Sequence, residues 1–283
     1  MAVQLRWPLD RFFKGEWIVP YADSNQADIY YEVMGEGEPL ILIMGLGGNL
    51  DWWGSGFRKR LAQRRQVIAC DNRAAGRTKS EKMDFSMEDM AEDVIALMDH
   101  LQCADADVFG MSMGGMIAQE MALRHPERVR RLILGCTSCG GKEQIRPTEA
   151  ASRLLTMRPS NLEEAIMHQL QLLFPPDYIA KNQVLLKALS AVLGRQPMTH
   201  KDFMRQYQAI ERWQGTFQRL PSLSQPTLIL HGEEDILLPV GNSTILADRL
   251  PNAKRMIYPG CGHGFVVQMT AQVFQALEDF LII

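Results

Sequence analysis

The chain alternates short apolar runs with segments whose apolar residues recur at helical spacing. The apolar runs predict strands at 16–22, 27–35, 39–45, 66–71, 106–111, 131–136, 226–232 and 254–260. The first two runs are typical of a hairpin, and the third is apolar throughout, which is typical of a strand buried on both faces. Helical spacing predicts helices between the later runs, such as 55–64 and the helix that the capping box Ser86–Asp89 opens. This alternation predicts an α/β fold, a mostly parallel sheet with helices on both faces.

One long segment interrupts the alternation. Residues 140–224 contain no clear strand pattern, only helical patterns such as 162–174 and 198–213. An insertion of this length in a compact fold usually covers an active site. We therefore predict a core domain formed by 1–139 and 225–283, with 140–224 as an inserted helical cap, or lid.

Composition and charge narrow the class of partner. The 283 residues are 46% apolar and contain 30 basic and 33 acidic side chains, with neither sign collected in a long block. This distribution predicts no nucleic-acid or membrane partner and favours a small neutral ligand. No signal-peptide core is visible near the N-terminus, and the most apolar stretch is about half the length that spans a bilayer. We therefore expect a soluble cytoplasmic protein.

The cysteines do not suggest a disulfide framework. They form an odd set in a large chain, consisting of Cys70, Cys103, Cys136, Cys139 and Cys261. This count fits a reducing cytosol. Cys136 and Cys139 could bind zinc only together with a second pair of ligands, such as Cys261 and His263. Small residues at a strand end are the simpler interpretation, so we predict no metal.

The string VFGMSMGGMIAQ at 108–119 places a serine between glycines where a predicted strand runs into a predicted helix. Gly110, Ser112 and Gly114 match G-x-S-x-G in the strand–turn–helix context that gives the motif its meaning. The small neighbours permit a sharp turn that exposes the Ser112 hydroxyl, and the helix N-terminus favours developing negative charge. A serine that caps the helix is the alternative.

A serine nucleophile needs a histidine base that is oriented by a carboxylate. Glu233, Glu234 and Asp235 follow the strand at 226–232, and His263 lies between glycines after the next strand. The order serine, acid, histidine is the one expected for a serine placed on such a turn. Among the histidines, His263 is favoured by this strand-end loop, whereas His231 fits a buried structural role.

An oxyanion hole can be formed by backbone amides. The Met113 amide directly follows the serine, and the glycine-rich loop Met44–Gly48 supplies a second donor, for which Leu46 is the favoured residue. Such donors can lower the barrier by about 3 kcal/mol each. The cluster of glycines in this loop favours close approach of the backbone to a ligand.

Taken together, these strings resemble the α/β-hydrolase superfamily over residues 25–283. The resemblance is carried by GEGEPLILIMGLGG, VIACDNRAAGRTKS, DVFGMSMGGMIAQEMALRHPERV, PTLILHGEEDILLPV and YPGCGHGF. It is strongest toward the capped esterases, enol-lactonases and cofactor-free haloperoxidases. It implies an eight-stranded sheet with Ser112 as nucleophile and His263 as base. It also selects Asp235 as the orienting acid, because related chains carry the acid at this position before Pro239.

Two positions depart from the pattern of the relatives. Met44 stands where many of them have histidine, which removes a side-chain hydrogen bond but leaves the Leu46 amide in place. Ala74 replaces a glycine in the loop that begins with Asp71 and Arg73. We interpret that loop as structural and assign neither Asp71 nor Arg73 to catalysis.

These observations predict a serine hydrolase that cleaves a carboxylic ester or lactone of a small, mainly apolar substrate through an acyl-enzyme, with no cofactor. Serine in place of aspartate argues against dehalogenation and epoxide opening, which the resemblance would otherwise allow. Two alternatives stay open: a carbon–carbon hydrolase of ring-cleavage products, although the Gly-Pro-Gly loop common there is absent, and a ligand receptor with little or no turnover. Candidate pocket residues are large and apolar: Trp52, Trp53, Met111, Met113, Met157, Phe174 and Trp213.

Overall fold

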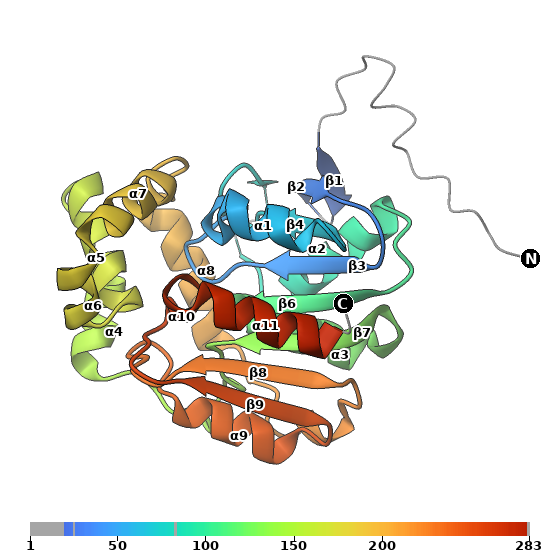
Figure 1. The fold of residues 1–283 in the computed structure, drawn as a ribbon. Coiled ribbons are helices and arrows are strands. Elements are labelled where there is room, and N and C mark those ends of the chain that lie inside the picture. Colours follow the sequence, from blue (N-terminus) through green and yellow to red (C-terminus); the bar gives the residue numbers. More distant parts are fainter. Residues whose placement is uncertain (1–19, 25, 82–83, 282–283) are drawn as a thin grey trace, which may run out of the picture.

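A computed structural model describes residues 20–24, 26–81 and 84–281, which form one sheet covered by helices (Figure 1). The strands follow the spatial order β1-β2-β4-β3-β6-β7-β8-β9, with β5 beside β2. Their bounds are β1 Tyr21–Ser24, β2 Ala27–Met34, β3 Pro39–Ile43, β4 Gln66–Cys70, β5 Lys79–Ser80, β6 Ala106–Met111, β7 Val129–Gly135, β8 Thr227–Gly232 and β9 Ala253–Tyr258. The predicted α/β class is confirmed. Most of the strand expected at 16–22 lies outside the described residues.

The direction of the strands places the site. From β4 across to β9 every neighbouring pair is parallel, whereas β2 runs antiparallel to both β1 and β4. In the central pairs Ile43 lies opposite Gly110, and Gly110 lies opposite Leu134. The carboxyl ends of β3, β6 and β7 therefore meet at one edge of the sheet, where ligands bind in open parallel sheets.

Helices cover both faces of the sheet because the buried strands are apolar on both sides. In β3, Ile41 and Ile43 belong to the apolar cluster beneath α2 (Met87–His100) and α3 (Met113–Arg124). Leu40 and Leu42 alternate with them and belong to the cluster beneath α1 (Ser55–Leu61) and α11 (Thr270–Leu281). Full burial of one such side chain stabilises the fold by about 1.5–3 kcal/mol. The capping box predicted at Ser86–Asp89 is confirmed at the start of α2.

The C-terminal helix differs from its prediction. The apolar residues Val266, Val273, Leu277 and Phe280 follow one stripe and predict a single helix from about Val266 that can cover the sheet. The structure instead divides this segment into α10 (Phe265–Gln268) and α11, with Met269 between them in a non-helical conformation. Val273 and Leu277 are buried on the sheet as expected from the stripe, whereas Val266 is only partly buried. Val266 instead lines a cavity near the strand ends, together with Gly264 and Thr270.

Between β7 and β8 the chain forms helices that stand beyond the carboxyl ends of the strands (Figure 1). These helices, which we call the α4–α8 insertion, are α4 Glu149–Thr156, α5 Leu162–Leu173, α6 Pro176–Lys181, α7 Gln183–Leu193 and α8 His200–Arg212. After β8 the chain returns to the sheet through α9 (Gly241–Arg249) and β9. In the described part of the chain, no helix has the length and apolar character needed to cross a membrane.

The insertion leaves and rejoins the core at one point. The Thr216 N–H donates a hydrogen bond of 2.7 Å to the carbonyl of Cys139. A Cβ on Gly215 would lie 2.5 Å from that same carbonyl oxygen, so the two chain segments touch through their backbones. Gly215 has a φ of +80°, and Gly140 opposite it has a φ of +66°, which favour glycine at both positions.

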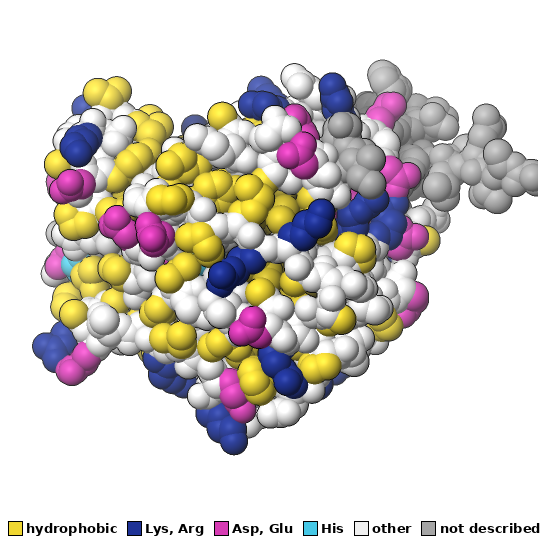
Figure 2. Space-filling model, turned by 60° about the horizontal axis from the view of Figure 1, so that its bottom comes forward, with side chains coloured by type: hydrophobic (Ala, Val, Ile, Leu, Met, Phe, Trp, Pro, Cys, Tyr) yellow, Lys and Arg dark blue, Asp and Glu magenta, His cyan; other side chains and the backbone are white. Residues whose placement is uncertain are grey.

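The surface of the insertion carries exposed apolar side chains. Met157, Leu162, Met167, Val184 and Leu185 are all exposed there. On the face shown in Figure 2, hydrophobic side chains gather over the insertion, while basic and acidic side chains are interspersed. This mixture of charges agrees with the absence of a charged block in the sequence.

Candidate active site

Ser112 occupies a sharp turn between β6 and α3. Its φ of 57° and ψ of −121° lie in a region that residues with a side chain rarely adopt, and such strain costs about 1–3 kcal/mol. Two hydrogen bonds hold the turn: the Ser112 N–H donates to the Gly135 carbonyl at 2.8 Å, and the Thr137 hydroxyl donates to the Ser112 carbonyl at 2.7 Å. The core thus supports a backbone conformation that would otherwise relax.

The glycines of the motif allow this turn to pack against the strands. A Cβ on Gly110 would lie 2.2 Å from the Gly114 carbonyl oxygen, and a Cβ on Gly114 would lie 2.1 Å from the Ile43 carbonyl oxygen. Neither space admits a side chain. Ser112 occupies the N-cap position of α3, but its side chain makes no capping hydrogen bond to the helix, so capping does not account for a serine at this position.

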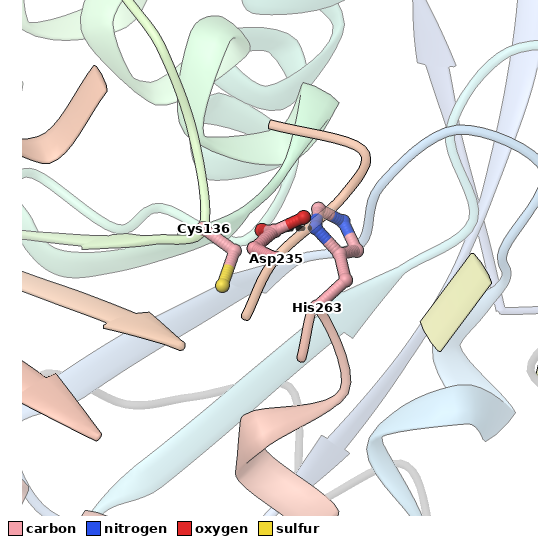
Figure 3. Close-up of side chains that lie close together, drawn as sticks. All are labelled: Cys136, Asp235 and His263. Carbon is pink, nitrogen blue, oxygen red and sulfur yellow. Dashed lines mark hydrogen bonds and ion pairs between the residues drawn. The ribbon is translucent and has the colours of Figure 1, made fainter. Parts of the chain in front are cut away.

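Asp235 and His263 are joined at the ends of β8 and β9 (Figure 3). Asp235 Oδ2 lies 2.7 Å from His263 Nδ1. The other carboxylate oxygen, Oδ1, accepts the N–H groups of Leu237 and Leu238, at 2.9 Å each. Both side chains are buried, with only 5% of each residue exposed. These contacts fix the carboxylate so that it faces the imidazole.

The environment of Asp235 favours its charged form. Burial would raise the pKa of the Asp235 carboxyl, but the charge of His263 and the hydrogen bonds from His231 and His263 outweigh burial and hold this pKa well below its usual range. The carboxyl is therefore a carboxylate at neutral pH. It can orient the imidazole and stabilise a positive charge on that ring.

The other acids and the other histidine near the end of β8 do not contact His263 as Asp235 does. Glu233 and Glu234 are exposed, and Glu233 Oε2 accepts a long hydrogen bond from the Gly260 N–H at 3.4 Å. His231 is fully buried, and its Nε2 lies 2.7 Å from the Leu238 carbonyl oxygen, in agreement with a structural role. Of the three acids that follow β8, Asp235 is thus the one in contact with His263.

The loop after β3 passes directly beside Ser112. A Cβ on Gly45 would lie 2.8 Å from Ser112 Cβ, which explains glycine at this position. Asn72 supports the loop from the other side, because its side-chain amide donates to the Met44 carbonyl at 2.7 Å. In the part of the chain that the structure describes, no hydrogen bond occupies the amide N–H of Leu46 or Met113.

Ser112 and His263 line one cavity of about 470 Å³ beneath the α4–α8 insertion. Leu46 and Met113 line it as well, and so do the predicted pocket residues Trp52, Trp53, Met111 and Phe174. Most other lining side chains are apolar and come from α5, α7 and α8, such as Leu172, Leu189 and Phe203. The cavity can therefore hold a small, mainly apolar molecule against Ser112.

The sequence of this chain matches a known family. A family model described as the alpha/beta hydrolase fold matches residues 38–268. The chain belongs to the α/β-hydrolase family. This hydrolase is 32% identical over 261 residues to a protein named as a carbamate hydrolase, RutD, from Azorhizobium caulinodans, covering 92% of this chain and 96% of the relative. It is 31% identical over 255 residues to the 2-hydroxymuconate semialdehyde hydrolase of a Pseudomonas species, covering 87% and 88% of the two chains.

Solved structures show the same fold. The enol-lactonase from Burkholderia xenovorans aligns with a TM-score of 0.81 at 24% identity, covering 93% of this chain and all of that one (100%). An N-acyl homoserine lactone degrading enzyme aligns with a TM-score of 0.78 at 26% identity, covering 92% and 100%. The α/β hydrolase described above therefore shares its architecture with enzymes of several activities.

Two of the predicted pocket residues do not line the cavity of this hydrolase. Trp213 is buried in the core, where its indole N–H donates to Glu120 Oε1 at 2.7 Å and its ring fills the space beside Gly140. Met157 is 45% exposed and borders a neighbouring cavity of about 410 Å³, which is lined mostly by the insertion and also by Gly47 and Trp52 of the core. Both predictions were wrong because an apolar residue at helical spacing can face the core, solvent or a ligand alike.

Polar residues also line the cavity, and the sequence pattern does not indicate them. Arg146, Tyr207 and Glu211 line it on the side of the insertion. Arg146 Nη1 lies 3.0 Å from Glu211 Oε2, across a separation of 65 positions in the chain. Nothing in the spacing of these residues indicates that they meet, since Arg146 lies in the segment before α4 and Glu211 lies on α8.

One group of possible metal ligands occurs among the described residues, and it includes the Asp235–His263 pair. Cys136, Asp235 and His263 offer ligand atoms within 4.8 Å of one another (Figure 3). Burial, followed by the charge of Asp235, raises the pKa of the Cys136 thiol well above its usual range, and a protonated thiol is a poor ligand. Cys139 and Cys261 lie outside this group, so the four-ligand zinc arrangement weighed for the sequence is not assembled.

Proposed function

We propose that this α/β hydrolase is a serine hydrolase that cleaves a carboxylic ester or lactone of a small, mainly apolar substrate. The observation that carries the proposal is that Ser112 and His263, whose Nδ1 is paired with the buried Asp235, line the same cavity. Ser112 is the nucleophile, His263 the general base and Asp235 the group that orients the base. The reaction passes through an acyl-enzyme on Ser112, which water then hydrolyses.

The pairing of His263 assigns the proton transfers. Because His263 Nδ1 is occupied by Asp235, Nε2 is the nitrogen that accepts the Ser112 proton and later returns it to the leaving group. No direct hydrogen bond joins Ser112 Oγ to His263 in the described part of the chain. Such bonds are often long in free enzymes and shorten when substrate binds, and we propose the same here.

The tetrahedral oxyanion is held by backbone amides. Leu46 and Met113 both line the cavity that contains Ser112, and no described residue accepts a hydrogen bond from the amide N–H of either. Met113 is the first residue of α3, so its N–H is one of the unsatisfied donors at the helix N-terminus. Each donor of this type can contribute about 3 kcal/mol to transition-state stabilisation.

The substitution Gly45→Ala tests the close approach of the loop to the nucleophile. The added methyl would lie 2.8 Å from Ser112 Cβ and 3.1 Å from the Met111 carbonyl oxygen, so the loop or the serine must shift. We expect kcat/KM for ester hydrolysis to fall at least about tenfold and the free energy of unfolding to fall by about 1–3 kcal/mol. Urea unfolding and an ester assay measure both.

A matched control for this variant is Gly56→Ala in α1. Gly56 is exposed, and a Cβ there has no atom within 4 Å. We expect this variant to keep full activity and to gain about 0.5–1 kcal/mol of stability, since alanine favours helix more than glycine does. Equal activities of the Gly45→Ala variant and the wild type would show that the loop tolerates a side chain beside Ser112.

The α4–α8 insertion serves as the lid of this site and its helices set the substrate selectivity. It supplies much of the apolar cavity wall, and its position over the strand ends keeps the reaction apart from bulk solvent, so that deacylation uses water that enters the cavity. The five cysteines are buried free thiols, which agrees with the cytoplasmic location that we propose.

A carbon–carbon hydrolase is the second candidate, favoured by the 31% identity to 2-hydroxymuconate semialdehyde hydrolase. Carbamate cleavage is a further acyl transfer that the same residues support, and the relative named as a carbamate hydrolase favours it. All three reactions share the nucleophile and differ in the bond that breaks. The three reactions can therefore be distinguished by comparing the rates at which the protein cleaves esters or lactones, carbamates and carbon–carbon substrates.

A substrate panel tests the proposal. Short p-nitrophenyl esters, lactones, a carbamate and a vinylogous 1,5-diketone are assayed with the purified protein, and the protein is analysed by mass spectrometry during turnover. We expect the highest kcat/KM for an ester or lactone and an acyl mass on the peptide that contains Ser112. Preference for the diketone would favour carbon–carbon hydrolysis. No turnover with any of the substrates would favour a ligand receptor.

A further inference from the structure

Gln206 extends from the insertion into the core beside the proposed oxyanion hole. It lies on α8, is fully buried with 0% exposed, and uses both ends of its side-chain amide. Its Oε1 accepts the Gly47 N–H at 3.0 Å, and its Nε2 donates to the Arg73 carbonyl at 2.6 Å. One side chain of the insertion therefore connects two loops of the core.

The orientation of this amide is dictated by its partners. Gly47 offers only a donor and Arg73 only an acceptor at these positions, so the reversed amide would place donor against donor and acceptor against acceptor. A hydrogen-bonded pair of this kind tolerates little rotation, because a buried backbone group without a partner is costly. The position of Gly47 is thereby tied to that of α8.

Gly47 directly follows Leu46, whose amide N–H we propose as an oxyanion donor. The loop is short: the Gly48 N–H donates to the Gly45 carbonyl at 3.2 Å, which closes a turn around Leu46. Phe203, also on α8, packs against Gly47, because a Cβ on Gly47 would lie 3.2 Å from the Phe203 ring. A shift of Gly47 therefore changes the direction of the Leu46 N–H.

The other partner of Gln206 is firmly anchored. The Arg73 guanidinium contacts the Asp93 carboxylate through Nε at 2.5 Å and Nη2 at 2.7 Å. Asp93 lies on α2, within the core, and is buried. The bond from Gln206 to the Arg73 carbonyl thus fixes the amide relative to the sheet, and the amide in turn holds Gly47.

We propose that Gln206 is a positioning residue that sets the direction of the Leu46 N–H and makes oxyanion stabilisation depend on the docking of the α4–α8 insertion. This inference rests on the proposed function. It assigns to the insertion a catalytic contribution in addition to covering the cavity. When α8 lies in place, the Leu46 amide points to the oxyanion; when α8 moves away, that donor loses its alignment and Ser112 attacks without full stabilisation.

The test is Gln206→Met, with Gln208→Met as the matched control. Gln208 lies on the same helix and is exposed, so the same exchange there removes no buried hydrogen bond. For Gln206→Met we expect kcat to fall about 10- to 100-fold with KM changed less than about threefold, because a small misalignment of a donor has effects of this size. The affinity for a boronic acid, which mimics the tetrahedral state, should fall by a similar factor.

A second variant, Gln206→Glu, gives a pH readout that does not depend on the first variant folding. A protonated carboxyl offers one donor and one acceptor, which are the two functions that the Gln206 amide uses here, whereas a carboxylate cannot donate to the Arg73 carbonyl. We expect the ratio of the variant kcat to the wild-type kcat to rise as the pH falls. A role limited to folding would lower the yield or the melting temperature of the variants. It would not change kcat per active site, where active sites are counted by fluorophosphonate labelling of Ser112.

The outcomes distinguish this inference from the proposed function. If the wild type shows no Ser112-dependent turnover, the proposed function fails. If the wild type turns over through Ser112 but Gln206→Met retains its kcat and its boronic acid affinity, or if the Gln206→Glu ratio is flat with pH, the positioning role of Gln206 is overturned.

Discussion

Replacing Ser112 with alanine is expected to lower kcat for ester hydrolysis by about 10⁴- to 10⁶-fold. Without the hydroxyl, no acyl-enzyme forms, and the amides and His263 can act only on a water molecule. The protein should stay folded, because the hydroxyl makes no hydrogen bond to α3 and the backbone bonds of Ser112 to Gly135 and Thr137 remain. Steady-state kinetics and circular dichroism on the same preparation check both expectations.

The control for this prediction is Ser152→Ala. Ser152 also lines the cavity, but it lies within α4 and not on the strained turn that presents Ser112. We expect a change in kcat of less than about tenfold. Labelling by a fluorophosphonate gives a second measure: one label per chain in the wild type and in the control, and none in the Ser112→Ala protein. Equal rates for the wild type and the Ser112→Ala protein would reject Ser112 as nucleophile.

Asp235→Asn is expected to lower kcat by about 10⁴-fold near neutral pH. The asparagine amide would donate to His263 Nδ1, at the position where the carboxylate now lies 2.7 Å away. That contact favours the tautomer with the proton on Nε2, which cannot accept the proton of Ser112. The loss of the negative charge also removes the stabilisation of the imidazolium. Glu234→Gln, an exposed change on the same loop, should alter kcat by less than about twofold.

The same variant has a pH-dependent effect on stability. The folded-state pKa of Asp235 lies well below its usual range, whereas the unfolded chain titrates near the ordinary value of about 3.9. The ionised carboxyl therefore contributes stability that is fully present above about pH 4 and is lost as the pH falls toward the folded-state pKa. Urea unfolding should show a stability gap between wild type and Asp235→Asn that is constant from about pH 7 to about pH 5 and narrows as the pH falls below about 4. A gap that does not narrow below about pH 4 would contradict this linkage.

Much of the core could be predicted from the sequence because its signals are local. The runs that became β3, β4, β6, β7 and β8 are apolar on both faces, and this pattern is typical of strands in the middle of a parallel sheet. The turn at Ser112 is set by glycines whose Cβ positions are occupied by neighbouring backbone. The contact between Asp235 and His263 could be anticipated because both follow neighbouring parallel strands.

The remainder depends on tertiary contacts that leave no periodic signal. Gln206 is a polar residue on an amphipathic helix, and such a position is normally exposed; its burial follows from the approach of α8 to Gly47 and Arg73. Trp213 was misassigned to the pocket because its partner Glu120 is 93 positions away in the chain. The break between α10 and α11 at Met269 has no proline or glycine that would indicate it.

The hydrogen bond between Thr216 and Cys139 gives the α4–α8 segment the properties of an exchangeable module. Its two ends meet at one place at the edge of the sheet. An insertion of a different length could therefore be joined at the same residues without a change in the positions of β7 and β8. The part of the cavity wall that the insertion supplies can therefore change as a unit, while the part that contains Ser112 and His263 stays the same.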